Sequence, residues 1–360
     1  MTGHGSRSPS ARSHEGEGGL RPFPGGSGAG SPVSSGSPVL PGDDAAAPGS
    51  AAEGAAQRRR VAVVTDSAAA LPPAWLASFE ATGGFAAVDM PVLIGGQLHT
   101  EDETDRLSSL VVALAEGRPV TTSRPAPGQL RAAYHRAETA GFEAVVSVHL
   151  SGELSDTVAA ARIARQEIGI PVRIVDTASA GLGQGLGVRA ALAAAASGAG
   201  VDDVARAARE ASAAAQVLIQ VRSLDTLRRG GRVKPTAAVV GSMLQLKPLL
   251  SLAGGRIVTV ERPVSAPRAR ERFMSLVGRA LREAEPEHPV LCVHHVADPH
   301  GAREIGEVLV DRYRPDARLV VSELPPVLSA HLGLGAKAAV VEGPTSAPVA
   351  HGVRAPQPGS

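Results

Sequence analysis

The sequence predicts an α/β protein of two lobes: a parallel α/β lobe at residues 60–215 and an α+β lobe with antiparallel strands at residues 216–341. In the first half, β-branched runs that end in small polar residues alternate with helical patterns, which is typical of a parallel sheet covered by helices. In the second half, a Gly-Gly pair between two apolar runs indicates an antiparallel hairpin. Segments 1–59 and 342–360 are rich in Gly, Ser, Pro and Ala, and we expect disordered tails there because they cannot bury a core.

The elements of the first lobe follow from hydrophobic patterning. Short apolar runs that end in small polar residues predict buried parallel strands at residues 61–65, 145–150 and 172–175. Apolar residues that recur every three or four positions predict helices at residues 127–140, 155–168 and 202–215. Asp202 stands where it would cap the last of these helices.

The second lobe begins with the hairpin and continues with alternating elements. Gly254 and Gly255 separate the two strands of the hairpin, expected at residues 249–253 and 256–260. An amphipathic helix follows, because one helical face would carry Phe273, Leu276, Val277, Ala280 and Leu281. After it we expect a strand at 290–296, a helix that carries Ile305, Val308 and Leu309, and a strand at 318–322.

Composition excludes several classes of protein. With 36 basic and 35 acidic residues the formal net charge is +1, and aromatic residues make up 2%, so no nucleic-acid partner is expected. A single cysteine, Cys292, excludes an intramolecular disulfide framework and fits a reducing, cytoplasmic location. No run reaches the roughly 18 apolar residues of a membrane-spanning helix, so we expect a soluble protein without stable membrane insertion.

Common catalytic and cofactor signatures are absent from the sequence. It contains no GxxxxGK[ST], GxSxG or HExxH segment. The glycine cluster that starts at Gly181 has Leu186 where a dinucleotide fingerprint needs its last glycine. His294 and His295 are adjacent on a predicted strand and would point to opposite faces, which disfavours a metal site. We therefore expect neither metal nor cofactor.

Hydroxyl side chains at element junctions give the clearest functional signal. Thr122 and Ser123 stand shortly before a predicted helix, Ser151 follows a predicted strand, and Ser155 precedes the next helix. Hydroxyls beside unpaired backbone N–H groups favour an anion, although N-capping alone explains any one of them. Two such junctions in one lobe predict a binding site for an anionic group the size of a carboxylate. His331, in a segment that is expected to be a loop, would add a third hydrogen-bond donor to this site.

With these residues named, the chain resembles the DegV family, the fatty-acid-binding subunits of bacterial fatty acid kinases, from about residue 61 to residue 341. Seven segments match in order. They are VVTDSAAALP (family TDSSADLP), VTTSRPAPGQL (TSQPSPGQF), SVHLSGELSDTVAAA (ISSGLSGTYQSA), VDTASAGLGQG (the glycine run after DS), LDTLRRGGRV (LEYLKKGGRI), LQLKPLL (LxIKPIL) and AHLGLGA (HxGPGA).

The resemblance implies a two-lobe, DegV-like carrier that encloses one long-chain fatty acid and is not itself catalytic. A separate subunit similar to dihydroxyacetone kinases would phosphorylate the carboxylate. The residues that match family positions at the carboxylate are Thr122, Ser123, Ser151, Ser155 and His331, and the choice between the two later serines stays open. Arg232 and Arg262 match arginines that would face the phosphate or the kinase, so that loss of Arg232 would spare lipid binding. Asp66 and Ser67 would support the pocket.

Two other functions stay open at this stage. One is a stand-alone binding protein for a lipid or another apolar acid, without a kinase partner, and the other is an enzyme that acts by itself. Asp156, which replaces a family glycine, bears on the ligand because its carboxylate would repel an acid head group unless it points outward.

Overall fold

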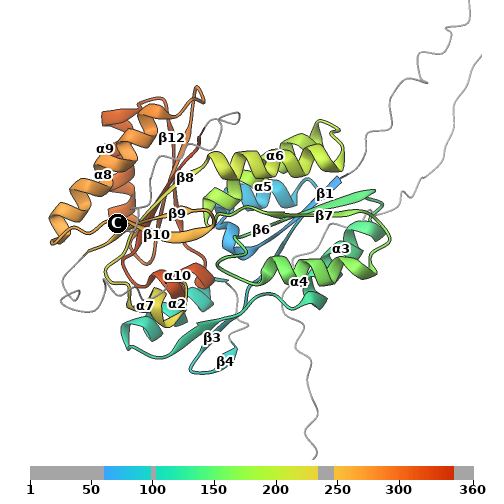
Figure 1. Ribbon diagram of the computed structural model, residues 1–360, viewed down its shortest axis with the longest axis horizontal. Coiled ribbons are helices and arrows are strands. Elements are labelled where there is room, and N and C mark those ends of the chain that lie inside the picture. Colours follow the sequence, from blue (N-terminus) through green and yellow to red (C-terminus); the bar gives the residue numbers. More distant parts are fainter. Residues whose placement is uncertain (1–60, 99–102, 234–246, 344–360) are drawn as a thin grey trace, which may run out of the picture.

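The computed structural model describes residues 61–98, 103–233 and 247–343, which form three sheets with helices packed around them (Figure 1). The predicted tail at 1–59 lies outside the described residues, as does most of the predicted tail at 342–360. Figure 1 shows two groups of elements side by side, with a smaller third layer below them.

The first sheet is parallel, as the sequence predicted, with strand order β2-β1-β6-β7. Its central strands β1 and β6 are buried along their whole length, which explains why apolar residues predominate in them. The strands are β1 (Val61–Asp66), β2 (Phe85–Val88), β6 (Ala144–His149) and β7 (Val172–Asp176).

Helices cover both faces of this sheet. One face packs on α3 and α4 through Leu130, Tyr134 and Ala160, and the other packs on α5 and α6 through Val188 and Val204. The helical segments of this half are η1 (Ser67–Ala69), α1 (Pro73–Glu80), α3 (Pro127–Thr139), α4 (Thr157–Ala164), η2 (Arg165–Glu167), α5 (Leu182–Ala196) and α6 (Val201–Ala214). The helix expected at 155–168 is therefore an α-helix followed by a short 3-10 turn.

The second sheet has six strands in the order β10-β9-β8-β13-β11-β12. Its pairs are antiparallel, including the predicted hairpin, except for β11 and β12, which are parallel. The sheet is therefore mixed, and helix α9 (Pro299–Tyr313) connects the two parallel strands β11 and β12. The strands are β8 (Gln216–Gln220), β9 (Leu249–Ala253), β10 (Arg256–Glu261), β11 (Val290–His295), β12 (Arg318–Glu323) and β13 (Lys337–Val341).

Helices α8 (Ala266–Glu283) and α9 (Pro299–Tyr313) cover one face of the six-stranded sheet. Their buried side chains include Phe273 and Ile305, as the helical periodicity predicted, whereas Val308 is exposed. Glu342, which the composition assigns to the C-terminal tail, forms an ion pair with Arg189 and is thereby attached to the fold.

The third sheet is small, with order β4-β3-β5, and the sequence analysis did not predict it. Its strands are β3 (Val92–Ile94), β4 (Gln97–Leu98) and β5 (Val120–Thr122). Apolar side chains join this sheet to α2 (Glu103–Ala115) and α10 (Pro326–Leu332), with α7 (Asp225–Arg229) beside α10. The third layer therefore brings β5, from the first half of the chain, next to α10, from its end.

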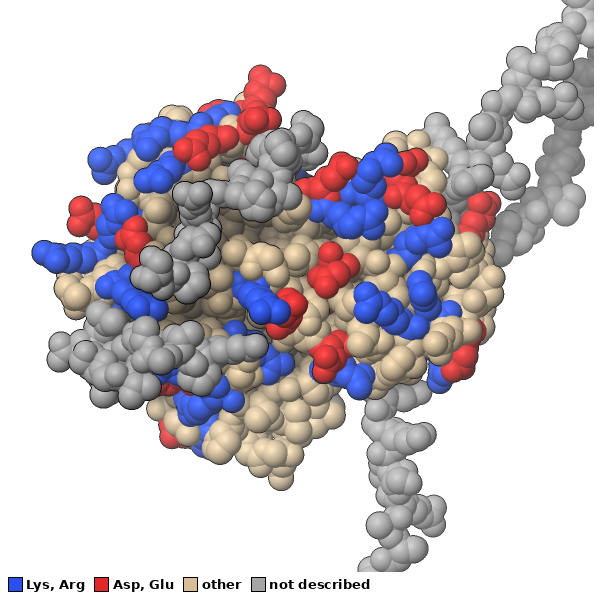
Figure 2. All heavy atoms as spheres, in the orientation of Figure 1, with Lys and Arg blue, Asp and Glu red and all other residues tan. Residues whose placement is uncertain are grey.

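Acidic and basic side chains are interspersed on the face that Figure 2 shows. Exposed charged side chains of the described residues form ion pairs, such as Arg173 with Asp202 and Arg256 with Glu153. No helix within the described ranges combines the length and the apolarity needed to cross a bilayer.

Candidate functional site

A cavity lies where the inner face of the six-stranded sheet meets the small third layer. Its empty volume, which includes open solvent at the mouth, is about 770 Å³. Its walls are mostly aliphatic, with side chains from β8, β9, β10 and β13 on the sheet side and from α7 and α10 on the other. The apolar lining includes Leu150, Leu154, Val217, Ile219, Leu227, Leu252, Ile257, Val327, Leu328, Leu332 and Val340.

Polar side chains gather at one end of this cavity. Thr122, Ser123, Ser155, Arg232 and His331 all belong to its lining. The Oγ1 atom of Thr122 and the Nε2 atom of His331 are 2.8 Å apart and share a hydrogen bond. We call these five residues the polar end, and such a combination of an aliphatic chamber and one polar end suits an amphipathic acid.

His331 lies in the last turn of α10, which corrects the expectation that its segment is a loop. Burial, together with the nearby charge of Arg232, lowers the pKa of His331 to about 4. The imidazole is therefore neutral at pH 7, and one ring nitrogen can donate a hydrogen bond while the other accepts one.

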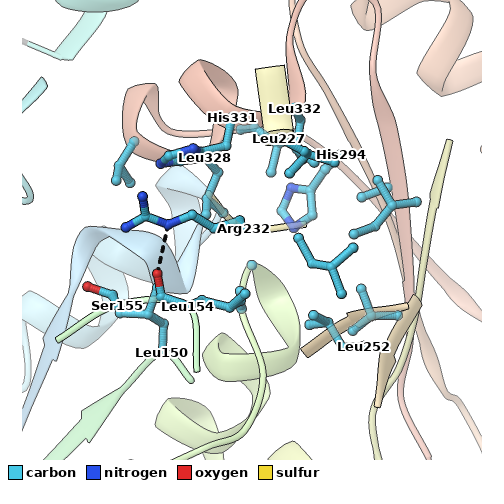
Figure 3. A pocket seen from close by; sticks show the side chains of 18 of the residues that line it. Leu150, Leu154, Ser155, Leu227, Arg232, Leu252, His294, Leu328, His331 and Leu332 are labelled. Atoms are coloured by element: carbon cyan, nitrogen blue, oxygen red, sulfur yellow. Dashed lines mark hydrogen bonds between the residues drawn. The ribbon is translucent and has the colours of Figure 1, made fainter. Parts of the chain in front are cut away.

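Arg232 is half-buried in the cavity wall, so it does not face outward only, as a purely partner-facing residue would. Its Nε donates to the carbonyl oxygen of Leu154 at 3.0 Å, and its Nη1 donates to the carbonyl oxygen of Gly230. Figure 3 shows the guanidinium between His331 and the Leu154–Ser155 segment. Because both acceptors are neutral carbonyls, the positive charge of Arg232 remains available to an anion at the polar end.

The structure separates the two serines between which the sequence could not decide. Ser155 lines the cavity, and its hydroxyl shares a 2.8 Å hydrogen bond with Thr157. Ser151 is buried, lies outside the lining, and donates from its hydroxyl to the carbonyl oxygen of Gly255 in the β9–β10 turn at 2.7 Å. Asp156 is exposed and lies outside the lining of the cavity.

The other predicted site residues lie outside the lining. Arg262 is exposed beside a shallow surface depression between β10 and α8. The Ser67 hydroxyl accepts a hydrogen bond from the backbone N–H of Met90, which does line the cavity.

Asp66 is fully buried at the centre of a polar network. It accepts hydrogen bonds from the amide of Gln184 and from the Nδ1 of His149, which is 2.7 Å away. The Nε2 of His149 bonds Ser147, and Ser147 bonds Tyr134. The order Asp, His and Ser also occurs in the catalytic triads of hydrolases. Here all members of the network are fully buried and none lines the cavity. The network instead connects β1, β6, α3 and α5.

His294 is a cavity residue that sequence reasoning considered only as a metal ligand. It is fully buried, accepts from the backbone N–H of Leu182 at Nε2 (3.2 Å) and contacts the carbonyl oxygen of Ser322 through Nδ1 (3.3 Å). Burial lowers its pKa to about 4, so it is neutral. The imidazole joins the start of α5 to the six-stranded sheet, a contact that only the spatial arrangement reveals. Within the described ranges no three His, Cys, Asp or Glu side chains are placed to hold a metal ion.

Comparisons with known proteins identify the family. The sequence model of the DegV family, described as an uncharacterised protein family, matches residues 60–343. The chain belongs to the DegV family. A DegV domain-containing protein of Streptomyces coelicolor is 39% identical over 283 residues, which are 79% of this chain and 98% of that protein. One from Mycobacterium tuberculosis is 35% identical over 289 residues, 80% of this chain and 99% of the other.

Solved DegV structures share the fold. A DegV family protein from Thermus thermophilus, described by its fatty acid binding, superposes with a TM-score of 0.68 at 28% identity over 79% of this chain and 99% of its own. DegV from Bacillus subtilis, described as a fatty acid binding protein, has a TM-score of 0.68 at 24% identity over 79% of this chain and 100% of its own. The predicted combination of a parallel α/β half with a largely antiparallel half is confirmed.

Proposed function

We propose that this DegV protein is a non-catalytic carrier that encloses a long-chain fatty acid, with the acyl chain in the aliphatic cavity and the carboxylate at the polar end. The observation that supports this most is the asymmetry of the cavity. The five residues of the polar end lie together, and the remaining wall is mostly aliphatic. The exception is the imidazole of His294, which is hydrogen-bonded to Leu182 and Ser322. A fatty acid has the same division into one anionic head and one long apolar tail.

At the polar end, each residue has a distinct part in the proposal. When the ligand binds, the Thr122 hydroxyl and the Nε2–H of the neutral His331 imidazole exchange their mutual hydrogen bond for bonds to the carboxylate, and Ser155 adds a third donor. Arg232 supplies the positive charge that offsets the cost of placing a carboxylate in a half-buried site. In this assignment Ser151 shapes the wall through Gly255 and does not contact the ligand.

The second part of the proposal is that the head group is presented to a separate kinase subunit, similar to dihydroxyacetone kinases, which forms the acyl phosphate. Arg262, exposed beyond the cavity, is the residue we assign to the partner or to the transferred phosphate. A cytoplasmic location, which suits the single buried Cys292, belongs to the same proposal.

The test is mass spectrometry of the purified protein under native and then denaturing conditions, with lipid extraction. A stoichiometric fatty acid that is released on denaturation is the expected result. Incubation with ATP should then give acyl phosphate only when the kinase subunit is added. Ligand without turnover would favour a stand-alone binding protein, turnover without the kinase would favour an enzyme, and failure to take up added palmitic acid would exclude the fatty acid.

A further inference from the structure

Gly230, at the C-terminal end of α7, lies directly against the imidazole of His331. A Cβ atom built on Gly230 would be 2.4 Å from Nδ1 and 2.9 Å from Cε1 of that ring. Non-bonded carbon contacts are favourable near about 3.5–4.0 Å. A methyl group at position 230 would therefore overlap the ring, and either the ring or the backbone would have to move.

The ring of His331 cannot move without breaking a bond of the polar end. Its Nε2, which is joined to Nδ1 through Cε1, is the atom that is hydrogen-bonded to Thr122. An imidazole is rigid, so pressure on Nδ1 displaces Nε2 as well. The helix that carries His331 is itself held in place, because its Val327 and Ala330 are buried in the cluster that joins α10 to the small sheet.

The backbone of Gly230 is also held from both directions. Its N–H donates to the carbonyl oxygen of Thr226 at 2.9 Å, and its own carbonyl accepts from Arg232. Arg232 in turn is bonded to Leu154 on the opposite side of the cavity. The contact between Gly230 and His331 is therefore a fixed part of the polar end.

The backbone conformation of Gly230 does not itself require glycine. Its φ of −74° and ψ of −7° are open to any residue. The neighbouring Gly231 is the opposite case, because its φ is +72° and nothing lies within 4 Å of the position of a Cβ atom. Position 230 therefore requires glycine because a side chain would overlap the His331 ring, and not because of its backbone conformation.

We propose that Gly230 is a positioning residue of the head-group site: the absence of a side chain lets the His331 ring lie where its Nε2 faces Thr122 and the ligand. This inference rests on the proposed function for the role of His331 in binding. The contact itself does not depend on which ligand is bound.

The experiment compares Gly230→Ala with the matched control Gly231→Ala. Gly230→Ala should shift the His331 ring nitrogen resonances in the unliganded protein and lower the affinity for palmitic acid about ten- to hundredfold, the range for a lost hydrogen bond to a charged group. Gly231→Ala should lower the melting temperature through backbone strain and leave the affinity unchanged. In a His331→Ala background, where the ring is absent, Gly230→Ala should have no further effect on affinity.

Unchanged His331 resonances in Gly230→Ala would overturn the inference whether or not palmitic acid binds. An equal loss of affinity in the wild-type and His331→Ala backgrounds would overturn it as well. A wild-type protein that does not bind palmitic acid, with shifted resonances in Gly230→Ala, would contradict the proposed function and leave the positioning role of Gly230 supported.

Discussion

The Oγ1 atom of Thr122 and the Nε2 atom of His331 lie 2.8 Å apart, although 209 positions separate the two residues. Thr122 ends β5 in the small sheet, and His331 lies in the last turn of α10. The polar end therefore forms only when the third layer is assembled from both halves of the chain.

Replacement of His331 by Ala should weaken the binding of palmitic acid by about 1.5–3 kcal/mol, because a buried hydrogen bond to a charged head group is lost. Thr122→Val, which keeps the shape but removes the hydroxyl, should act in the same direction. Isothermal titration calorimetry measures both changes. The exposed His300 offers a control, since His300→Ala should bind like the wild type. If His331→Ala bound with wild-type affinity, His331 would not belong to the site.

The Thr122–His331 pair also marks the limit of prediction from sequence. The strands β1, β6 and β7 could be predicted because each contains a short apolar, β-branched run that ends in small polar residues. Strands β3, β4 and β5 have two or three residues each, too few for a hydrophobic period, and their pairs such as Val92 with Thr122 join distant segments. The hydroxyl junctions and the family resemblance assigned Thr122 and His331 to one anion site, but no local pattern predicts that their side chains are in contact.

Ser151 and Ser155 show the same limit at the level of single side chains. Both are hydroxyls at element junctions, and the sequence signal is identical. Their different environments depend on Gly255, which lies 104 positions from Ser151 and accepts its hydrogen bond.

This difference leads to opposite expectations for two alanine variants. Ser151→Ala should lower the free energy of unfolding by about 1–2 kcal/mol, because the Gly255 carbonyl loses a buried donor, and should leave palmitic acid binding intact. Ser155→Ala should weaken binding by about 1 kcal/mol with little effect on stability. Urea unfolding and calorimetry on the same two proteins separate the effects. The reverse pattern would assign the carboxylate to Ser151.

Arg232 and Arg262 form a second pair with divided expectations. Arg232→Met removes the cation of the polar end and should lower palmitic acid affinity about tenfold, as expected for loss of a charge-assisted contact. Arg262→Met, at an exposed position outside the lining, should bind normally and reduce acyl phosphate formation when kinase and ATP are present. If Arg232→Met bound palmitic acid with wild-type affinity, Arg232 would not contact the carboxylate and would instead face the phosphate or the kinase, as the sequence suggested.

The pH dependence of stability should report on His294. Burial lowers the pKa of His294 to about 4, whereas an unfolded histidine has a pKa near about 6.5. Between these values the unfolded chain binds a proton that the folded protein excludes, so the free energy of unfolding falls as the pH is lowered from about 6.5 to about 4. A shift of this size corresponds to up to about 3 kcal/mol.

His294→Gln keeps a donor and an acceptor for Ser322 and Leu182 but cannot titrate, so the loss between pH 7 and pH 5 should be smaller than in the wild type. Urea unfolding at the two pH values measures this difference, and groups common to both proteins, including His331, cancel in it. Above pH 7 the free energies of unfolding of the two proteins should change with pH in parallel, because His294 is neutral in both the folded and the unfolded state. An equal loss in both proteins would mean that His294 is protonated in the fold at pH 5, and that the link between α5 and the six-stranded sheet does not depend on its neutral ring.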